Sequence, residues 1–178
     1  MNVRHLVAAV AAATACHAVV AQSDLPEPVR VPAGHTMAMK AMGVGEITYE
    51  CRAKTGDPAA FEWVFVAPVA KLMDASNKEV GKYYAGPTWE AADGSKVAGH
   101  TVASVDSSDP NAIAHLLLKA DSHAGFGVLA GVKSVQRLQT SGGRAPKEAC
   151  AAKDIGRQAR VPYTATYYFY AEGPASGY

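Results

Sequence analysis

The sequence predicts an all-β fold, an antiparallel β-sandwich or barrel of about eight strands with one or two short helices. Two observations lead to this prediction. Apolar and polar residues alternate with a period of two along most of the chain, and Gly, Pro, Asn and Asp separate the alternating runs. Short strands separated by turn residues are typical of antiparallel sandwiches and barrels.

The clearest strand covers residues 46–53, where Ile47, Tyr49 and Cys51 alternate with polar residues. Such a strand has one buried face, so we expect Cys51 to point inward. Near the C-terminus, residues 163–170 carry aromatic side chains at both odd and even positions, which predicts a central strand covered on both faces. The other predicted strands cover residues 35–41, 61–67, 80–85, 96–105, 115–120, 128–139 and 159–171.

Two stretches favour helix over strand. Asp109-Pro110-Asn111 offers an N-cap followed by proline, and we expect one helical turn there before the strand that begins at His115. Residues 146–153 are rich in alanine around Cys150 and predict a short helix.

The N-terminus has the layout of a secretory signal peptide. Arg4 precedes an apolar run over residues 6–15, and small residues continue to Ala21, where we expect cleavage. An alternative is lipoprotein processing at Cys16, although the leucine usual at the third position before the cysteine is missing. Either route predicts a periplasmic or extracellular protein, and no later segment is long and apolar enough to span a membrane.

The exported chain divides into three parts. Residues 22–33 contain three prolines and predict an extended N-terminal lead that is not packed as an element. Residues 34–172 form a single β domain, and residues 173–178 form a C-terminal tail.

Processing leaves two cysteines, Cys51 and Cys150, in an oxidising compartment, which favours a disulfide between them; two unpaired buried thiols are the alternative. Without Arg4 the chain has 16 Lys and Arg against 16 Asp and Glu. This balance predicts no electrostatic attraction to nucleic acid or to an anionic membrane.

Motifs that would indicate an enzyme or a cofactor are missing. Gly43-Val44-Gly45 begins like a dinucleotide loop, but Thr48 stands at the third glycine position and a strand follows, so no cofactor is predicted. The histidines at positions 35, 100, 115 and 123 form no local metal-ligand pair, so no metal is predicted, and no serine lies in a GxSxG turn. We therefore favour a protein that is not an enzyme.

The densest candidate site lies within residues 83–96. Aromatic faces stack on sugar rings and carboxylates accept hydrogen bonds from hydroxyl groups, so Tyr83, Trp89, Glu90 and Asp93 suit a carbohydrate or another small polar ligand. We expect Trp89 to be partly exposed and to form the floor of the site. The alternatives are a glycosidic hydrolase that uses Glu90 and Asp93, and a structural or protein-binding domain in which Trp89 fills the core and Asp93-Gly94 is only a turn.

Several strings are long enough to support a resemblance: VPAGHTMAMKAMGVGEITYEC, YYAGPTWEAADGSKVAG, HLLLKA, GVKSVQRLQTSGG and VPYTATYYFY. Over about residues 29–171 the chain resembles the domain-of-unknown-function family 3455, found in exported proteins of bacteria and fungi. The resemblance implies export, and it places both cysteines where the family has cysteines. It implies no activity, because the family has none established.

Overall fold

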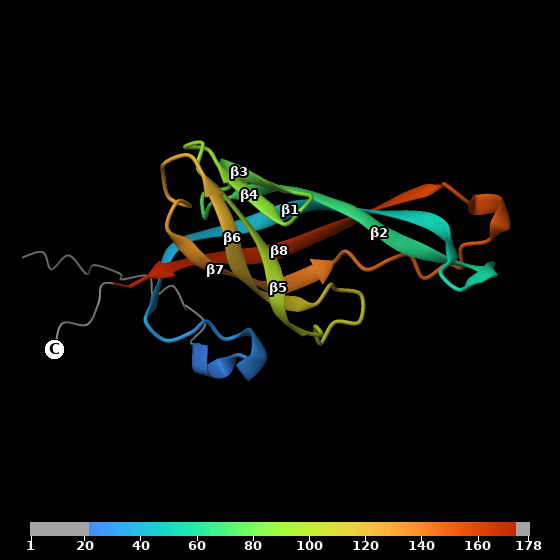
Figure 1. Cartoon of the computed structure of the whole chain (residues 1–178), viewed down its shortest axis with the longest axis horizontal. Helices are drawn as coiled ribbons and strands as arrows, with labels where there is room; N and C mark the ends of the chain where they lie inside the picture. Colours follow the sequence, from blue (N-terminus) through green and yellow to red (C-terminus); the bar gives the residue numbers. More distant parts are fainter. Residues whose placement is uncertain (1–21, 174–178) are drawn as a thin grey trace, which may run out of the picture.

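The protein forms an eight-stranded antiparallel β-barrel in the computed structural model, which describes residues 22–173 (Figure 1). Each strand pairs with its neighbours in sequence, and the last strand closes the barrel against the first. The strands are β1 (His35–Lys54), β2 (Asp57–Met73), β3 (Glu79–Tyr84), β4 (Thr88–Ala91), β5 (Lys96–Val105), β6 (His115–Ala124), β7 (Val132–Gly142) and β8 (Gln158–Glu172). The predicted all-β class is confirmed, and the arrangement is a barrel.

Two of the predicted strands are one strand. Runs 35–41 and 46–53 merge into β1 because Gly43 and Gly45 continue the strand instead of turning it. A Cβ at Gly45 would collide with the Val69 carbonyl on β2, and one at Gly43 would collide with the ring of Tyr167 on β8. The two glycines therefore allow β1 to pass close to both neighbours.

The local predictions had mixed outcomes. Strand β4 was not predicted, because four residues are too few to show alternation. The single turn expected at Asp109 is present, because the N–H of Ala112 donates to the Asp109 carbonyl at 3.0 Å, and the Asp109 carboxylate accepts a hydrogen bond from the backbone N–H of Asn111. In place of the helix over residues 146–153 there is a single 3-10 turn, η3 (Ala152–Asp154). No helix in the described part of the chain is long and apolar enough to cross a membrane.

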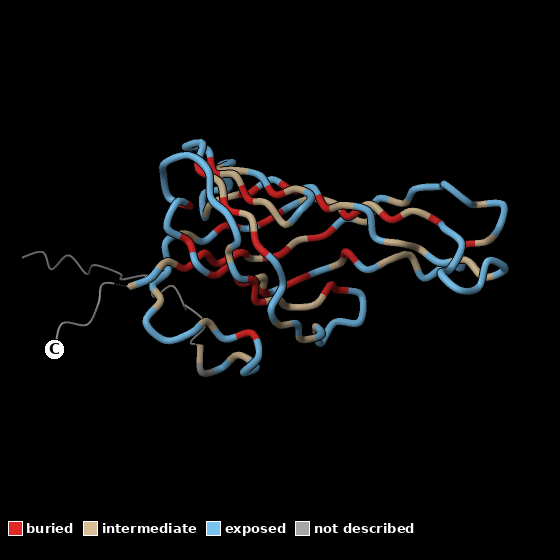
Figure 2. Tube along the Cα trace, in the orientation of Figure 1, coloured by how far each residue is buried: buried red, intermediate tan, exposed pale blue. Residues whose placement is uncertain are grey.

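Aromatic side chains fill the interior of the barrel. The ring of Trp89 stacks on that of Tyr83 at a centroid distance of 5.0 Å, and it meets the rings of Tyr167 and Phe169 edge-on at 5.7 and 5.9 Å. Figure 2 shows the buried residues concentrated along the strands of the barrel. These side chains belong to one apolar cluster, so the interior is a packed core.

A second cluster covers the outside of the barrel. The N-terminal segment forms two 3-10 turns, η1 (Gln22–Asp24) and η2 (Glu27–Val29), and packs on β5, β6, β7 and β8. Val29 is fully buried, so the prediction of an unpacked lead was wrong. Tyr168 and Tyr170 lie in this cluster, whereas Tyr167 and Phe169 face the interior, as expected for a strand covered on both faces.

Strands β1, β2 and β8 extend beyond the other strands, to the right in Figure 1. The predicted disulfide between Cys51 and Cys150 is present there, with the two Cα atoms 5.8 Å apart. The indole of Trp63 donates a hydrogen bond to the carbonyl of Glu148. These contacts attach the segment between β7 and β8 to the extended hairpin of β1 and β2.

Candidate functional site

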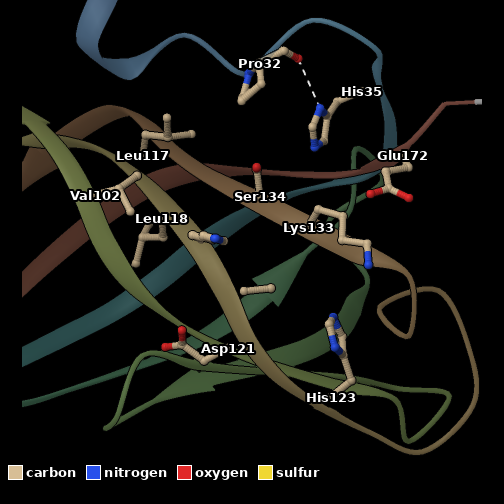
Figure 3. A pocket seen from close by; sticks show the side chains of 12 residues that line it. Pro32, His35, Val102, Leu117, Leu118, Asp121, His123, Lys133, Ser134 and Glu172 are labelled. Carbon is tan, nitrogen blue, oxygen red and sulfur yellow. Dashed lines mark hydrogen bonds between the residues drawn. The ribbon is translucent and has the colours of Figure 1, made fainter.

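A large cleft opens where β6 and β7 separate (Figure 3). The two strands pair only from Leu116 to Lys119 on β6, opposite Arg137 to Ser134 on β7. Beyond this pairing β6 stays hydrogen-bonded to β5, and the space beside β7 becomes a cleft of about 690 Å³. Pro32, from the chain before β1, contributes to its wall.

Two histidines enter the cleft from opposite sides (Figure 3). His35 Nδ1 lies 3.1 Å from the carbonyl oxygen of Pro32, and His123 Nε2 lies 2.6 Å from that of Val132. A carbonyl oxygen only accepts hydrogen bonds, so these two nitrogens carry the hydrogens. When neutral, each imidazole therefore presents its other nitrogen as an acceptor.

The cleft also contains charged side chains that form no ion pairs with one another. Lys119, Lys133 and Glu172 line it, and none makes an ion pair with any residue in the range 22–173. Asp121 also lines it, and its carboxylate lies 2.7 Å from Nδ1 of His100. Both signs of charge are thus available to a ligand.

Ser134 lies at the centre of the cleft wall in Figure 3. The residue is only 7 % exposed, and its hydroxyl makes no hydrogen bond to another described residue. Leu117 and Leu118 supply an apolar part of the lining. The cleft therefore combines an apolar surface with several hydrogen-bonding groups, a composition common in small-molecule sites.

The structure distributes the four sequence-predicted site residues over different environments. Trp89 is 1 % exposed and Tyr83 is buried beside it in the core, so the prediction that Trp89 is partly exposed and forms the floor of a site was wrong. Alternation explains the outcome, because Trp89 faces inward on β4 and pairs with Val97 on β5, which is also buried. No aromatic platform for a sugar ring lies at this place.

Glu90 faces outward on β4 among cations. Its carboxylate lies 3.1 Å from Lys96 Nζ and 3.4 Å from Lys82 Nζ, and it accepts a hydrogen bond from the Tyr84 hydroxyl at 3.0 Å. The hydrogen bond from Lys96 is the largest cause of a lowered pKa for Glu90. Glu90 is therefore a carboxylate held in its charged form by its neighbours.

Asp93 organises two turns. Its carboxylate accepts hydrogen bonds from the hydroxyl and backbone N–H of Ser95 and from the backbone N–H of Val128. These bonds, the one from the Ser95 hydroxyl foremost, lower the pKa of Asp93. Asp93 thus ties the β4–β5 turn to the β6–β7 loop, and it lines a different hollow from Glu90.

The family model described as a protein of unknown function, DUF3455, matches residues 32–171. The chain belongs to the DUF3455 family. The match covers the barrel almost entirely, including both disulfide cysteines. No curated protein and no solved structure matches the chain.

Sequence reasoning missed the cleft of this DUF3455 protein. Its ionisable residues come from positions as far apart as His35, His123 and Glu172, which no local motif connects. No group of three or more His, Cys, Asp or Glu side chains suited to a metal ion occurs among residues 22–173. An available signal was the pair of lysines, Lys119 and Lys133, on strands that were both predicted.

Proposed function

We propose that the protein is an exported, non-catalytic module that binds a small polar ligand in the cleft between β6 and β7. The observation that carries this proposal is a cleft of about 690 Å³ whose charged groups have no ion-pair partners among residues 22–173, apart from the Asp121–His100 pair. Sites for small molecules have volumes of roughly 300 to 1,000 Å³, so the cleft has room for one or two sugar rings.

The chemistry of the lining favours a ligand rich in hydroxyl groups. The amines of Lys119 and Lys133 donate hydrogen bonds, the carboxylates of Asp121 and Glu172 accept them, and the Ser134 hydroxyl does both. A monosaccharide or disaccharide presents donors and acceptors on every side and matches this mixture. Binding here relies on hydrogen bonds, because the aromatic rings expected to stack on a sugar are in the core.

No observation favours the hydrolase alternative. A glycosidic acid needs a carboxyl group whose pKa is raised so that it stays protonated near neutral pH. The pKa values of Glu90 and Asp93 are both lowered, and hydrogen bonds to neighbouring groups hold both carboxylates in the charged form. Glu90 forms ion pairs with lysines, and Asp93 stabilises a turn.

The proposal is tested by screening neutral monosaccharides, disaccharides and polyols against the oxidised protein, with backbone amide chemical shifts as the readout. We expect saturable shifts at Lys119, Ser134 and Lys133. Loss of a hydrogen bond to a charged group costs about 1.5 to 3 kcal/mol, so Lys133→Met and Glu172→Gln should each raise Kd at least about tenfold. Lys153→Met, at an exposed position in η3, is the matched control and should leave Kd unchanged.

Two results would contradict the proposal. A ligand whose shifts map to Tyr84 and Glu90 would place the site on the outer face of β3 and β4. If no member of the screen produced saturable shifts, a structural or protein-binding domain would be favoured instead.

Export forms part of the same proposal, supported by the disulfide and by the layout of residues 1–21, which lie outside the described residues. Expression of the full chain in a bacterial host, followed by fractionation and intact mass measurement, tests it. We expect a soluble periplasmic product that begins at Gln22. A membrane-bound product with a lipidated Cys16 would establish the lipoprotein route, and a cytoplasmic product with both thiols reduced would contradict export.

A further inference from the structure

Another hollow, of about 370 Å³, lies at the opposite end of β6 from His123 and shares no lining residue with the cleft. Two arginines line it, Arg137 from β7 and Arg144 from the segment that follows β7. The single carboxylate in its lining belongs to Asp106, whose side chain is 83 % exposed. The lining therefore carries one more positive than negative charge.

The position of Arg137 is unusual for a charged residue. Val135, two residues earlier on the same regular stretch of β7, packs in the barrel core, so alternation directs Arg137 to the inner face as well. Its guanidinium reaches the end of the barrel and donates two hydrogen bonds to the carbonyl oxygen of Ala114, at 3.1 and 2.8 Å. A carbonyl is neutral, so these bonds fix the guanidinium and leave its charge uncompensated.

Arg144 is held in a similar way. Its Nε donates to the carbonyl oxygen of Ala112 at 2.8 Å, and its Nη2 lies 2.9 Å from the carboxylate of Asp106. The Nη1 groups of Arg137 and Arg144 make no hydrogen bond to a residue in the range 22–173. Each arginine therefore keeps donors available for a further acceptor.

The backbone that orients both arginines is itself fixed. Ala112 forms a β-bridge with Gly143, and the N–H of Ile113 donates to the carbonyl of Gly142 at 2.9 Å. The Thr140 hydroxyl donates to the carbonyl of Ile113 at 2.6 Å. Because these bonds fix residues 112 and 113, the carbonyls on which the two guanidinium groups rest are positioned before any ligand arrives.

We propose that this hollow binds an oxyanion, a carboxylate, sulfate or phosphate group of a small ligand, between Arg137 and Arg144. A planar guanidinium matches such groups with paired hydrogen bonds, and arginines already fixed by backbone carbonyls lose little side-chain entropy on binding. The site is independent of the proposed sugar cleft, because the two share no residue.

Neighbouring titratable groups support this placement. The positive charge of both arginines acts on the hydroxyl of Tyr49, where burial is the larger influence and raises the pKa. Burial and, next, the charge of Arg137 lower the pKa of His115. An anion bound beside Arg137 offsets that charge, so it should raise the pKa of His115.

The test titrates the oxidised protein at low ionic strength with inorganic phosphate, sodium sulfate and D-glucuronate, with D-glucose as the uncharged control. Arginine Nε–H chemical shifts and calorimetry give the affinity. We expect saturable shifts at Arg137 and Arg144 with the anions and none with glucose, and preference for phosphate or for glucuronate identifies which source of oxyanion fits. Replacing either arginine by glutamine should raise Kd about tenfold or more, since hydrogen bonds between charged groups are lost.

Arg160→Gln is the matched control, because Arg160 lies on β8 with a side chain that is 70 % exposed and pairs with Glu46 outside the hollow. Should Arg137→Gln fail to fold, Arg144→Gln and the His115 titration of the unmodified protein decide the question. Anion binding with an unchanged Kd in Arg144→Gln and an unchanged His115 pKa would overturn the proposal, as would absence of binding. If no sugar bound in the cleft, the proposed oxyanion site would still stand, because it does not depend on the cleft.

Discussion

Trp89 provides the sharpest test of the barrel core. Substitution of a buried tryptophan by alanine costs about 3 to 5 kcal/mol, because the transfer free energy of the ring is lost and a cavity remains. The loss at Trp89 should lie in this range, since its ring packs on Tyr83, Tyr167 and Phe169. Trp89→Phe should cost only about 1 to 2 kcal/mol, because it keeps a ring and removes an indole N–H that is buried without a hydrogen-bond partner among the described residues.

The assay combines urea unfolding, followed by circular dichroism, with tryptophan emission. The chain has two tryptophans, so Trp63→Phe leaves Trp89 as the only indole. We expect emission at short wavelength that acrylamide quenches weakly. The reasoning is refuted if Trp89→Ala lowers the free energy of unfolding by less than about 1 kcal/mol, a value typical of surface positions, or if the Trp89 emission is quenched as readily as free indole.

Three further predictions concern the bonds around the core. Replacing Cys51 and Cys150 together by serine in a chain that begins at Gln22 should lower the free energy of unfolding by about 4 to 5 kcal/mol, because the two cysteines are 99 positions apart in the sequence. An unchanged Tm by calorimetry would show that the extended ends of β1, β2 and β8 unfold separately from the barrel. Asp93→Asn should lower Tm near neutral pH, and the difference in Tm between wild type and this variant should disappear as pH falls through the depressed pKa of Asp93. Glu27→Gln, at an exposed position in η2, is the control. If wild type and Asp93→Asn lost stability equally in acid, the role of Asp93 would be contradicted. Burial raises the pKa of Tyr163 to about 12, so the unfolded chain ionises first, and its contribution to stability should be intact below pH 10 and lost as pH rises toward 12. Ultraviolet titration of wild type against Tyr163→Phe measures this, and ionisation at the ordinary tyrosine pKa would contradict the burial.

Much of the fold followed from alternation alone. The pattern around Cys51 and the two aromatic faces of residues 163–170 identified strands whose burial the structure confirms. The alternation did not distinguish a barrel from a sandwich. Closure depends on the pairing of β1 with β8, which joins residues more than a hundred positions apart and leaves no local signal in the sequence. The glycines at 43 and 45 separated two predicted strands, although their role is close approach between strands.

The candidate site was harder to predict, for a physical reason that Trp89 and Asp93 illustrate. An aromatic residue beside a turn has the same composition whether it faces a ligand or the core, and the face depends on strand register. Register in turn depends on β4, a strand too short to recognise in the sequence. The carboxylate of Asp93 likewise serves the turn and the loop that it joins, and only the partner at Val128 distinguishes this role from ligand binding.

A filled barrel limits where a ligand can bind. Side chains of the aromatic core fill the interior, so a ligand site has to form outside it, for example where the sheet is interrupted or where the chain crosses an end of the barrel. Both proposed sites lie at such places: the cleft where β6 separates from β7, and the arginine hollow where residues 112–114 cross the barrel end. Among residues 22–173, the cleft has charged side chains without an ion-pair partner, and the hollow has arginine Nη1 groups without a hydrogen-bond partner. These groups are available to a ligand at little cost to the stability of the core.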